Sequence, residues 1–305
     1  MSLLVAGTVA FDAIETPFGK TDKVVGGSGL YISLSSSFFH DPVNLVSIVG
    51  DDFPDIMFKN LRKRGVDTEG VDIKTGKKSF FWSGKYHMDM NSRDTLVTDL
   101  NVLTEFKPVL PKTYRSSDFV MLGNIDPAIQ ISIIKQLKKQ PKLIAMDTMN
   151  FWMDSAPKEL KKAIKLADML IINDEEARAL SGEYSLAKAA RKILKMGPRF
   201  LVIKKGEHGA LLFSGNEIFF APALPMEDVF DPTGAGDVFA GGFMGYLAKT
   251  KNLSFTNMKR AIIYGSAMAS FCVEKFGPQR LLEIQQRQIQ KRVGEFVDLV
   301  KFRIK

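Results

Sequence analysis

Cysteine, histidine and tryptophan are scarce in this 305-residue chain, which has one Cys, three His and two Trp. Because Cys272 is alone, the chain has no intrachain disulfide framework and no thiolate cluster for a metal. His40, His87 and His208 lie far apart, without metal-ligand spacing and without a neighbouring nucleophile pattern. These absences exclude zinc chemistry and Ser-His hydrolysis.

Long apolar runs are also missing, since none reaches the roughly 18 to 20 residues of a membrane-spanning helix. Residues 1–7, MSLLVAG, lack the basic segment of a signal peptide and read as the start of a strand. We therefore expect a cytoplasmic protein with no membrane partner. The chain has neither the dinucleotide fingerprint nor the P-loop Gly-Lys-Ser/Thr, so an ATP site in it would not be of the Walker type.

The chain is basic, with 42 Lys and Arg against 34 Asp and Glu and a net charge of +8. Such a balance raises the question of a nucleic-acid partner. The basic residues are spread along the sequence, and the densest runs, 62–64 and 158–162, read as solvated helix faces. We therefore expect no nucleic-acid partner. An anionic cosubstrate such as ATP accounts equally well for the positive potential.

The most informative stretch is 231–243, DPTGAGDVFAGGF. It opens with turn residues and continues as a small, apolar run that predicts a buried helix. Gly234, Ala235 and Gly236 would then lie at a helix N-terminus, where backbone N–H groups and the helix dipole favour an anion. Asp237, in the first helical turn, could accept a hydroxyl proton beside that anion. The arrangement suits phosphoryl transfer to an alcohol, and a plain turn into a core helix is the simpler alternative.

The rest of the chain predicts a doubly wound α/β sheet. Apolar runs followed by helical spacing read as buried strands at 3–7, 43–52, 118–124, 143–150 and 168–173. Ligands bind at the carboxyl ends of such strands. We expect the first strand to deliver Asp12 to this edge, and later strands to deliver Asp126 and Asp147.

Between residues 71 and 102 the periodicity changes toward two, which predicts strands of a small separate sheet. This region is rich in aromatic and long apolar side chains, namely Phe80, Phe81, Trp82, Tyr86 and Met88. They could form the core of the small sheet, a dimer interface or a stacking surface for a base. Residues 291–305 predict a basic amphipathic helix.

Residues 231–243 closely resemble the C-terminal signature of the PfkB, or ribokinase, family of carbohydrate and nucleoside kinases. Gly26-Gly27 before a small-residue helix is similar to the N-terminal signature, although Tyr31 stands where that pattern has Asn. Residues 173–176 match the Asn-x-x-Glu motif. Residues 204–209 resemble the Thr-x-Gly-x-x-Gly hairpin, with a lysine in place of Thr. These motifs occur in family order over nearly the whole chain.

The resemblance implies one ribokinase-like three-layer α/β/α domain over residues 1–305, with a β-sheet lid formed by about 14–25 and 72–102. In this family the lid covers the acceptor and excludes water on closure. The protein would be a monomer or a homodimer joined through the lid.

The resemblance also implies roles for individual residues. Asp237 would be the catalytic base, and the backbone of Gly234, Ala235 and Gly236 the anion hole. The implied acceptor-binding residues are Asp12, Gly26, Gly27, Tyr31 and Asp126. The implied nucleotide-binding residues are Asn173, Lys204, Gly206, Gly209 and Ser266. Glu176 would organise Mg²⁺ through water, and Asp231 and Thr233 match positions that can hold a monovalent cation such as K⁺.

The expected activity is ATP- and Mg²⁺-dependent phosphorylation of a hydroxyl on a small acceptor. The aromatic residues of the small sheet and Tyr31 favour a nucleoside such as adenosine. A kinase of ribose, fructose or a related sugar is the alternative within enzymes. A nucleotide-binding sensor without turnover is the alternative from another class, and the presence of Asp237 argues against it.

Overall fold

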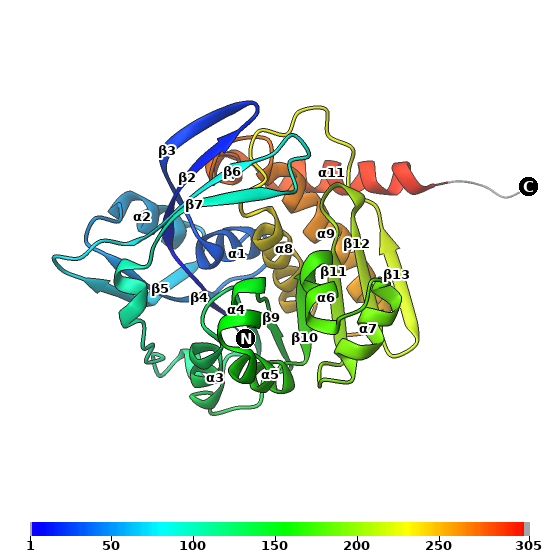
Figure 1. Ribbon diagram of the computed structural model, residues 1–305, viewed down its shortest axis with the longest axis horizontal. Helices are drawn as coiled ribbons and strands as arrows, with labels where there is room; N and C mark the ends of the chain where they lie inside the picture. The colour runs from blue at the N-terminus through cyan, green and yellow to red at the C-terminus, as the bar shows by residue number, and fades with distance from the viewer. Residues whose placement is uncertain (1, 302–305) are drawn as a thin grey trace, which may run out of the picture.

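The computed structural model describes residues 2–301, which form a large sheet covered on both faces and a smaller sheet beside it (Figure 1). The large sheet has nine strands, in the spatial order β13 (Glu217–Ala221), β12 (Ala210–Ser214), β11 (Phe200–Lys204), β10 (Met169–Asn173), β9 (Leu143–Met146), β8 (Phe119–Leu122), β1 (Leu3–Ala6), β4 (Val43–Gly50) and β5 (Val66–Lys74). The strands from β5 to β11 are parallel, and β12 and β13 add an antiparallel hairpin. Central strands such as β1 are fully buried because helices cover both faces.

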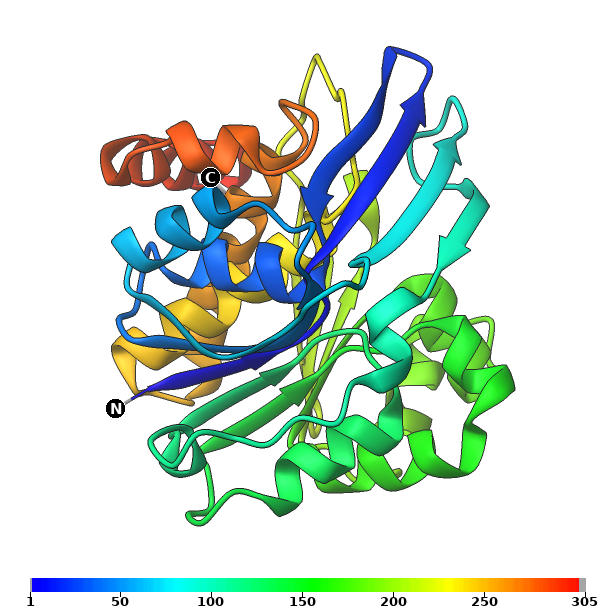
Figure 2. The same cartoon turned by 90° about the vertical axis from the view of Figure 1, so that its left-hand side faces the viewer.

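The helices divide between two hydrophobic cores, one on each face of the large sheet (Figure 2). One face is covered by α1 (Ser28–Ser36), α2 (Asp55–Lys63), α8 (Ala235–Thr250) and α9 (Phe255–Cys272). The other is covered by α3 (Pro127–Lys135), α5 (Pro157–Leu166), α6 (Asp174–Ser181) and α7 (Leu186–Leu194). The remaining elements are α4 (Asn150–Ser155), α10 (Gln279–Glu283), α11 (Gln286–Val300) and the 3₁₀ turns η1 (Asn101–Glu105), η2 (Tyr114–Ser116) and η3 (Gly206–His208). The predicted three-layer α/β/α architecture is confirmed.

The smaller sheet projects from the body as two hairpins, drawn in blue and cyan in Figure 2. Its order is β3 (Gly19–Gly26), β2 (Ala10–Thr16), β6 (Phe80–Tyr86) and β7 (Arg93–Asp99). The strands β6 and β7 lie where the period-two pattern predicts them. Residues 72–74, however, belong to β5, which pairs with β4 in the large sheet.

The position of Asp12 differs from the prediction. It lies on β2 of the smaller sheet rather than at the end of the first strand. The first strand ends at Ala6, and residues 7–9 carry the chain from one sheet to the other. The apolar residues Val9, Ala10 and Phe11 hide this break in the sequence, because they are buried between the sheets.

Small residues hold α8 close to α1, and this contact fixes the start of α8 at the sheet edge. Ser35 Oγ donates to the Val238 carbonyl at 2.7 Å, and Ser36 Oγ donates to the Gly241 carbonyl at 3.0 Å. Both serines are buried, so these bonds satisfy polar groups that would otherwise be costly.

The C-terminal helix α11 (Gln286–Val300) begins five residues before the predicted start. The predicted continuation through 302–305 lies outside the described residues. Between Ser2 and Lys301, none of the helices combines the length and apolar character needed to cross a membrane.

Candidate active site

The turn before α8 is built around Gly234. This residue is the N-cap of α8 with a φ of 77°, and a Cβ placed on it would lie 2.5 Å from two ring atoms of Tyr31. Only glycine combines this backbone conformation with so close a ring. The first N–H groups of α8 lack partners within the helix and lie at the positive end of its dipole. Ala235 N–H donates to the Pro232 carbonyl at 3.1 Å, so among the predicted anion-hole amides this one is engaged within the turn.

The Asp231 carboxylate joins this turn to Gly277, in the segment that follows α9. Its carboxylate accepts hydrogen bonds from Thr233 N at 2.8 Å and Gly277 N at 2.9 Å, and the residue is 1% exposed. Thr233 Oγ1 in turn donates to the Tyr86 hydroxyl at 3.2 Å, which connects the turn to the smaller sheet. The predicted roles of Asp231 and Thr233 toward a monovalent cation stay predictions.

Asp237 follows directly, in the first turn of α8. Burial and the nearby Asp147 raise the pKa of Asp237 to about 7, while Lys204 and Arg93 act in the opposite direction. Arg93 belongs to β7, so the smaller sheet brings a positive charge toward the start of α8. A carboxyl with this pKa can exchange a proton near neutral pH, as a general base must.

Asp12 lies close to the same turn. It is 5% exposed, and burial together with the charges of Asp231 and Asp237 raises its pKa to about 8. The Gly27 backbone hydrogen bond to its carboxylate favours ionisation, and a Cβ on Gly26 would lie 2.0 Å from its Oδ2. The structure therefore brings together Asp12, Gly26 and Gly27, and places them beside Asp237.

A second group of charged residues lies at the carboxyl ends of β9, β10 and β11. Asp147 follows β9, and Lys204 is the last residue of β11. The Lys204 Nζ lies 3.0 Å from Asp147 Oδ2, and both side chains are largely buried. A Cβ on Gly236 would lie 3.0 Å from the same Nζ, so this ion pair reaches the start of α8.

Asn173 and Glu176 form the capping box of α6. Glu176 N donates to Asn173 Oδ1 at 2.8 Å, and Asn173 N donates to Glu176 Oε2 at 2.7 Å. Burial and Asp147 raise the pKa of Glu176 to about 8, against the opposing effect of Lys204. Asp147, Glu176 and Asp237 thus form an acidic cluster that exceeds the charge of Lys204. No three acidic, His or Cys side chains within residues 2–301 are placed to hold a metal ion together. The predicted role of Glu176 needs no such group, because Mg²⁺ takes few protein ligands and shares the rest with water and phosphates.

The predicted nucleotide side lies around η3 and α9. Gly206 and Gly209 flank this turn with φ values of 54° and 88°. A Cβ on Gly206 would lie 2.1 Å from Asn91 Oδ1, so the β6–β7 hairpin lies against the turn. Ser266 is buried on α9.

Two predicted acceptor-binding residues, Asp126 and Tyr31, contact other parts of the protein. Asp126 is the N-cap of α3, where its Oδ1 accepts a hydrogen bond from Ala128 N at 2.7 Å. Tyr31 is 1% exposed and packs against Gly234, and its buried hydroxyl has no hydrogen-bond partner within residues 2–301. Contact of either with an acceptor stays a prediction. The position of Asp147 after a buried strand predicts that it lies at this edge of the sheet, but the sequence assigns it no role.

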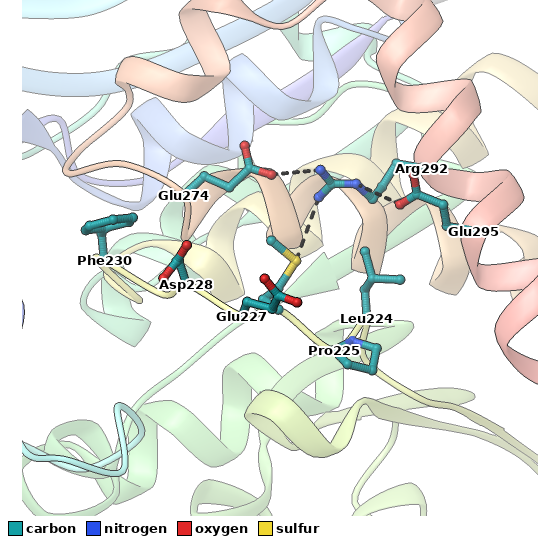
Figure 3. Close-up of a pocket in the computed structure, with 9 residues that line it drawn as sticks. Leu224, Pro225, Glu227, Asp228, Phe230, Glu274, Arg292 and Glu295 are labelled. Atoms are coloured by element: carbon teal, nitrogen blue, oxygen red, sulfur yellow. Dashed lines mark hydrogen bonds and ion pairs between the residues drawn. The ribbon is translucent and has the colours of Figure 1, made fainter.

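A pocket of about 420 Å³ lies next to the turn before α8, lined by residues before Asp231, by Glu274 and by residues of α11. Figure 3 shows Arg292 reaching between Glu274 and Glu295 at its edge. Arg292 also donates to Ser270 Oγ at 2.8 Å. Ser270 lies one helical turn beyond Ser266 on α9, so Arg292 connects the edge of this pocket to α9.

The comparisons with known proteins identify the family and the fold of the chain. Residues 5–285 match the model of the pfkB family of carbohydrate kinases. The chain is 30% identical over 253 residues to the cytidine kinase of Thermococcus kodakarensis, covering 81% of this chain and 88% of that one. It is 27% identical over 285 residues to the ribokinase of Bacillus subtilis, covering 92% of each.

A solved structure shares the fold over almost its full length. It is an E. coli protein described as a ribokinase II, in complex with ATP and Mg²⁺, with a TM-score of 0.79 and 19% identity over 96% of this chain and 99% of that one. The chain belongs to the pfkB family of carbohydrate kinases, and is thus a phosphotransferase that acts on an alcohol group.

Proposed function

We propose that this protein transfers the γ-phosphoryl group of ATP to a hydroxyl of a nucleoside, with Asp237 as the base. The observation that carries the proposal is the position of Asp237: its carboxyl has a pKa of about 7 and lies in the first turn of α8, beside Lys204 and Asp12. A base and an anion site are thereby joined in one helical turn.

In the proposed reaction, Asp12 holds hydroxyls of the acceptor and orients the one that reacts. Asp237 takes the proton of that hydroxyl as its oxygen bonds to the γ-phosphorus and the bond to the ADP oxygen breaks. The backbone of residues 234–236 faces the charge on the transferred group. Positioning and charge stabilisation account for most of the catalysis in such a transfer.

ATP and Mg²⁺ are the expected cosubstrate and cofactor. Glu176 would hold Mg²⁺ through water, and the ion would offset the charge of the phosphates. Asn173, Gly206, Gly209 and Ser266 would line the nucleotide site. Asp231 and Thr233 would hold a monovalent cation such as K⁺, if one binds.

The acceptor is the finer part of the proposal. The aromatic residues of β6, among them Trp82 and Tyr86, and the similarity to a cytidine kinase support a nucleoside. Adenosine, which the sequence favours, and cytidine are the first candidates for the acceptor. The similarity to a ribokinase supports the alternative of a sugar acceptor.

We further propose that β2, β3, β6 and β7 act as the lid over this acceptor. Two contacts support this role: the bond from Thr233 to Tyr86, and the approach of Asn91 to Gly206. The first contact joins the smaller sheet to the turn before α8, and the second joins it to the turn at Gly206. A lid with these contacts would exclude water from both substrates.

The test is an ADP-release assay with ATP and Mg²⁺ against a panel of nucleosides and sugars. On the best acceptor, Asp237→Asn should lower kcat by about 10²- to 10⁴-fold, because the general base is lost. The exposed Asp154, on α4, provides the control, and Asp154→Asn should leave kcat unchanged. Near-full turnover by Asp237→Asn would exclude Asp237 as the base, and a clear preference for sugars would replace the nucleoside.

A further inference from the structure

Lys204 places a positive charge at an unusual position. Its Nζ is fixed between Asp147 Oδ2, at 3.0 Å, and the backbone of Gly236, where a Cβ would lie 3.0 Å away. The ammonium therefore lies at the N-terminal turn of α8, the positive end of that helix. The side chain is only 16% exposed, so solvent screens it weakly.

Two positive features close together repel each other unless an anion lies between them or beside them. Asp147 supplies part of this compensation in the structure. Burial alone would lower the pKa of Lys204, but Asp147, Glu176 and Asp237 raise it above its usual value. The ammonium is thus kept charged in a place where helix and lysine both favour an incoming anion.

We propose that Lys204 contacts the phosphoryl group in transit, and that Asp147 is a positioning residue that holds the Lys204 ammonium at the start of α8. The inference rests on the proposed function and assigns to this lysine a task that a hydroxyl in the same place could not perform. A hydroxyl offers a hydrogen bond, whereas an ammonium adds a full charge where the equatorial oxygens of the transferred group gather negative charge.

The first test compares Lys204→Met with Lys205→Met, the matched control on the next residue. Lys205 Nζ lies over the Phe220 ring, 5.8 Å from its centroid, and has no part in the proposed contact with the phosphoryl group. Binding of ATP, ADP and AMP is measured by calorimetry without acceptor. In Lys204→Met the affinity for ATP should fall about tenfold or more, and that for AMP should change little, because only the terminal phosphate meets the ammonium.

Turnover should follow the same division. Lys204→Met should lose about 10²- to 10³-fold in kcat, the cost of removing one group that stabilises developing charge. Lys204→Arg should recover part of this loss, since it restores the charge with a different shape. Lys205→Met should retain the kcat of the wild type.

The pH profile gives a readout that a merely structural pair would not move. Asp237 is faced by Asp147, Lys204 and Arg93, of which Asp147 raises its pKa and the two cations lower it. The acid limb of kcat/KM should move to higher pH in Lys204→Met and to lower pH in Asp147→Asn. In addition, Asp147→Asn should lower kcat, because the ammonium loses its anchor.

The proposal is overturned if folded Lys204→Met binds ATP as tightly as the wild type and leaves the acid limb in place. If that variant does not fold, Lys204→Thr replaces it, with the same binding comparison and the same deciding result. Failure of the proposed function is separate: the wild type would turn over no acceptor. The affinities for ATP and AMP would still decide the role of Lys204.

Discussion

Asp237 owes its suitability as a base to its surroundings rather than to its residue type. An aspartate in water ionises near pH 4, whereas burial and Asp147 raise the pKa of Asp237 to about 7. The base is active when deprotonated, so activity should rise with pH up to this pKa.

We predict that kcat/KM measured from pH 5 to 9 falls on the acid side with a midpoint near pH 7. At pH 5 the value should be about 100-fold below the plateau, since each pH unit below the pKa removes about nine-tenths of the ionised base. A profile that stays flat down to pH 5 would mean that no carboxyl with a raised pKa controls the reaction. The acceptor must carry no group that titrates in the same range, so a neutral nucleoside is the appropriate substrate. MgATP is kept saturating, because its terminal phosphate itself titrates near this range.

Tyr31 is the residue at which sequence and structure suggest different roles. Its ring packs on Gly234 and its hydroxyl is buried without a partner. Removal of an unsatisfied buried hydroxyl should relieve a cost of about 1 kcal/mol or more. We therefore predict that Tyr31→Phe raises the free energy of unfolding in urea and leaves the KM for the acceptor unchanged. A rise in that KM with normal stability would instead assign the hydroxyl to the acceptor, as the sequence suggested.

The sequence predicts residues that act together within one short segment, but it does not predict contacts between residues of distant segments. The run 231–243 contains the whole turn, so Gly234 and Asp237 could be recognised from neighbouring residues. Lys204 and Asp147 are 57 positions apart, and their contact depends on how the strands β9, β10 and β11 align. Nothing in a local pattern specifies that alignment.

At the scale of elements, the start of α8 tolerates little change. Gly234→Ala would place a methyl group 2.5 Å from the Tyr31 ring in a backbone conformation that costs other residues about 1 to 3 kcal/mol. We predict a lower melting temperature and a reduced kcat, because the ring or the turn must move and the amides with it.

Gly182→Ala is the matched control. Gly182 ends α6 with a φ of 68°, but a Cβ there would meet nothing within 4 Å. This variant should pay only the backbone cost and keep its kcat, so the difference between the two measures the contact with Tyr31. Equal losses of stability and activity in both variants would show that the ring contact has no effect.

The boundary between the sheets shows why some elements escape prediction. The strands β1 and β2 are separated by only three residues, Gly7, Thr8 and Val9, yet they belong to different sheets. Both carry apolar side chains, because one is buried in the core and the other at the junction of the sheets. Periodicity reports burial, and it does not report which sheet provides it.

At the scale of the molecule, a basic protein concentrates acidic groups at one place. The net charge is +8, but Asp12, Asp147, Glu176 and Asp237 come together from four segments of the chain. Asp147 follows β9, Glu176 and Asp237 lie in the first turns of α6 and α8, and Asp12 comes from β2 of the smaller sheet. A bound metal ion would offset this negative charge, whereas the free protein bears its cost.

That cost should appear as a pH-dependent instability. The folded-state pKa of Asp12 is about 8, above the value of 3.8 expected for the unfolded chain. Its contribution to stability is therefore fully present below pH 3.8 and is lost as the pH rises through 8. Asp12→Asn imitates the neutral carboxyl at every pH. At pH 8.5 the variant should exceed the wild type by about 2 kcal/mol or more in free energy of unfolding, since one pKa unit corresponds to about 1.4 kcal/mol.

Urea unfolding of the free protein at pH 4.5, 6.5 and 8.5 measures this difference. The gain of Asp12→Asn over the wild type should be small at pH 4.5 and should grow with each step, while the exposed Asp154→Asn should give no such trend. Comparing variants at each pH removes the effect of carboxyls with lowered pKa, such as Asp52 and Asp118, whose protonation destabilises the fold in acid. A difference that stays constant with pH would mean that Asp12 ionises normally in the folded state. The acidic centre would then impose no cost on the free protein, and a bound metal ion would have no repulsion to relieve.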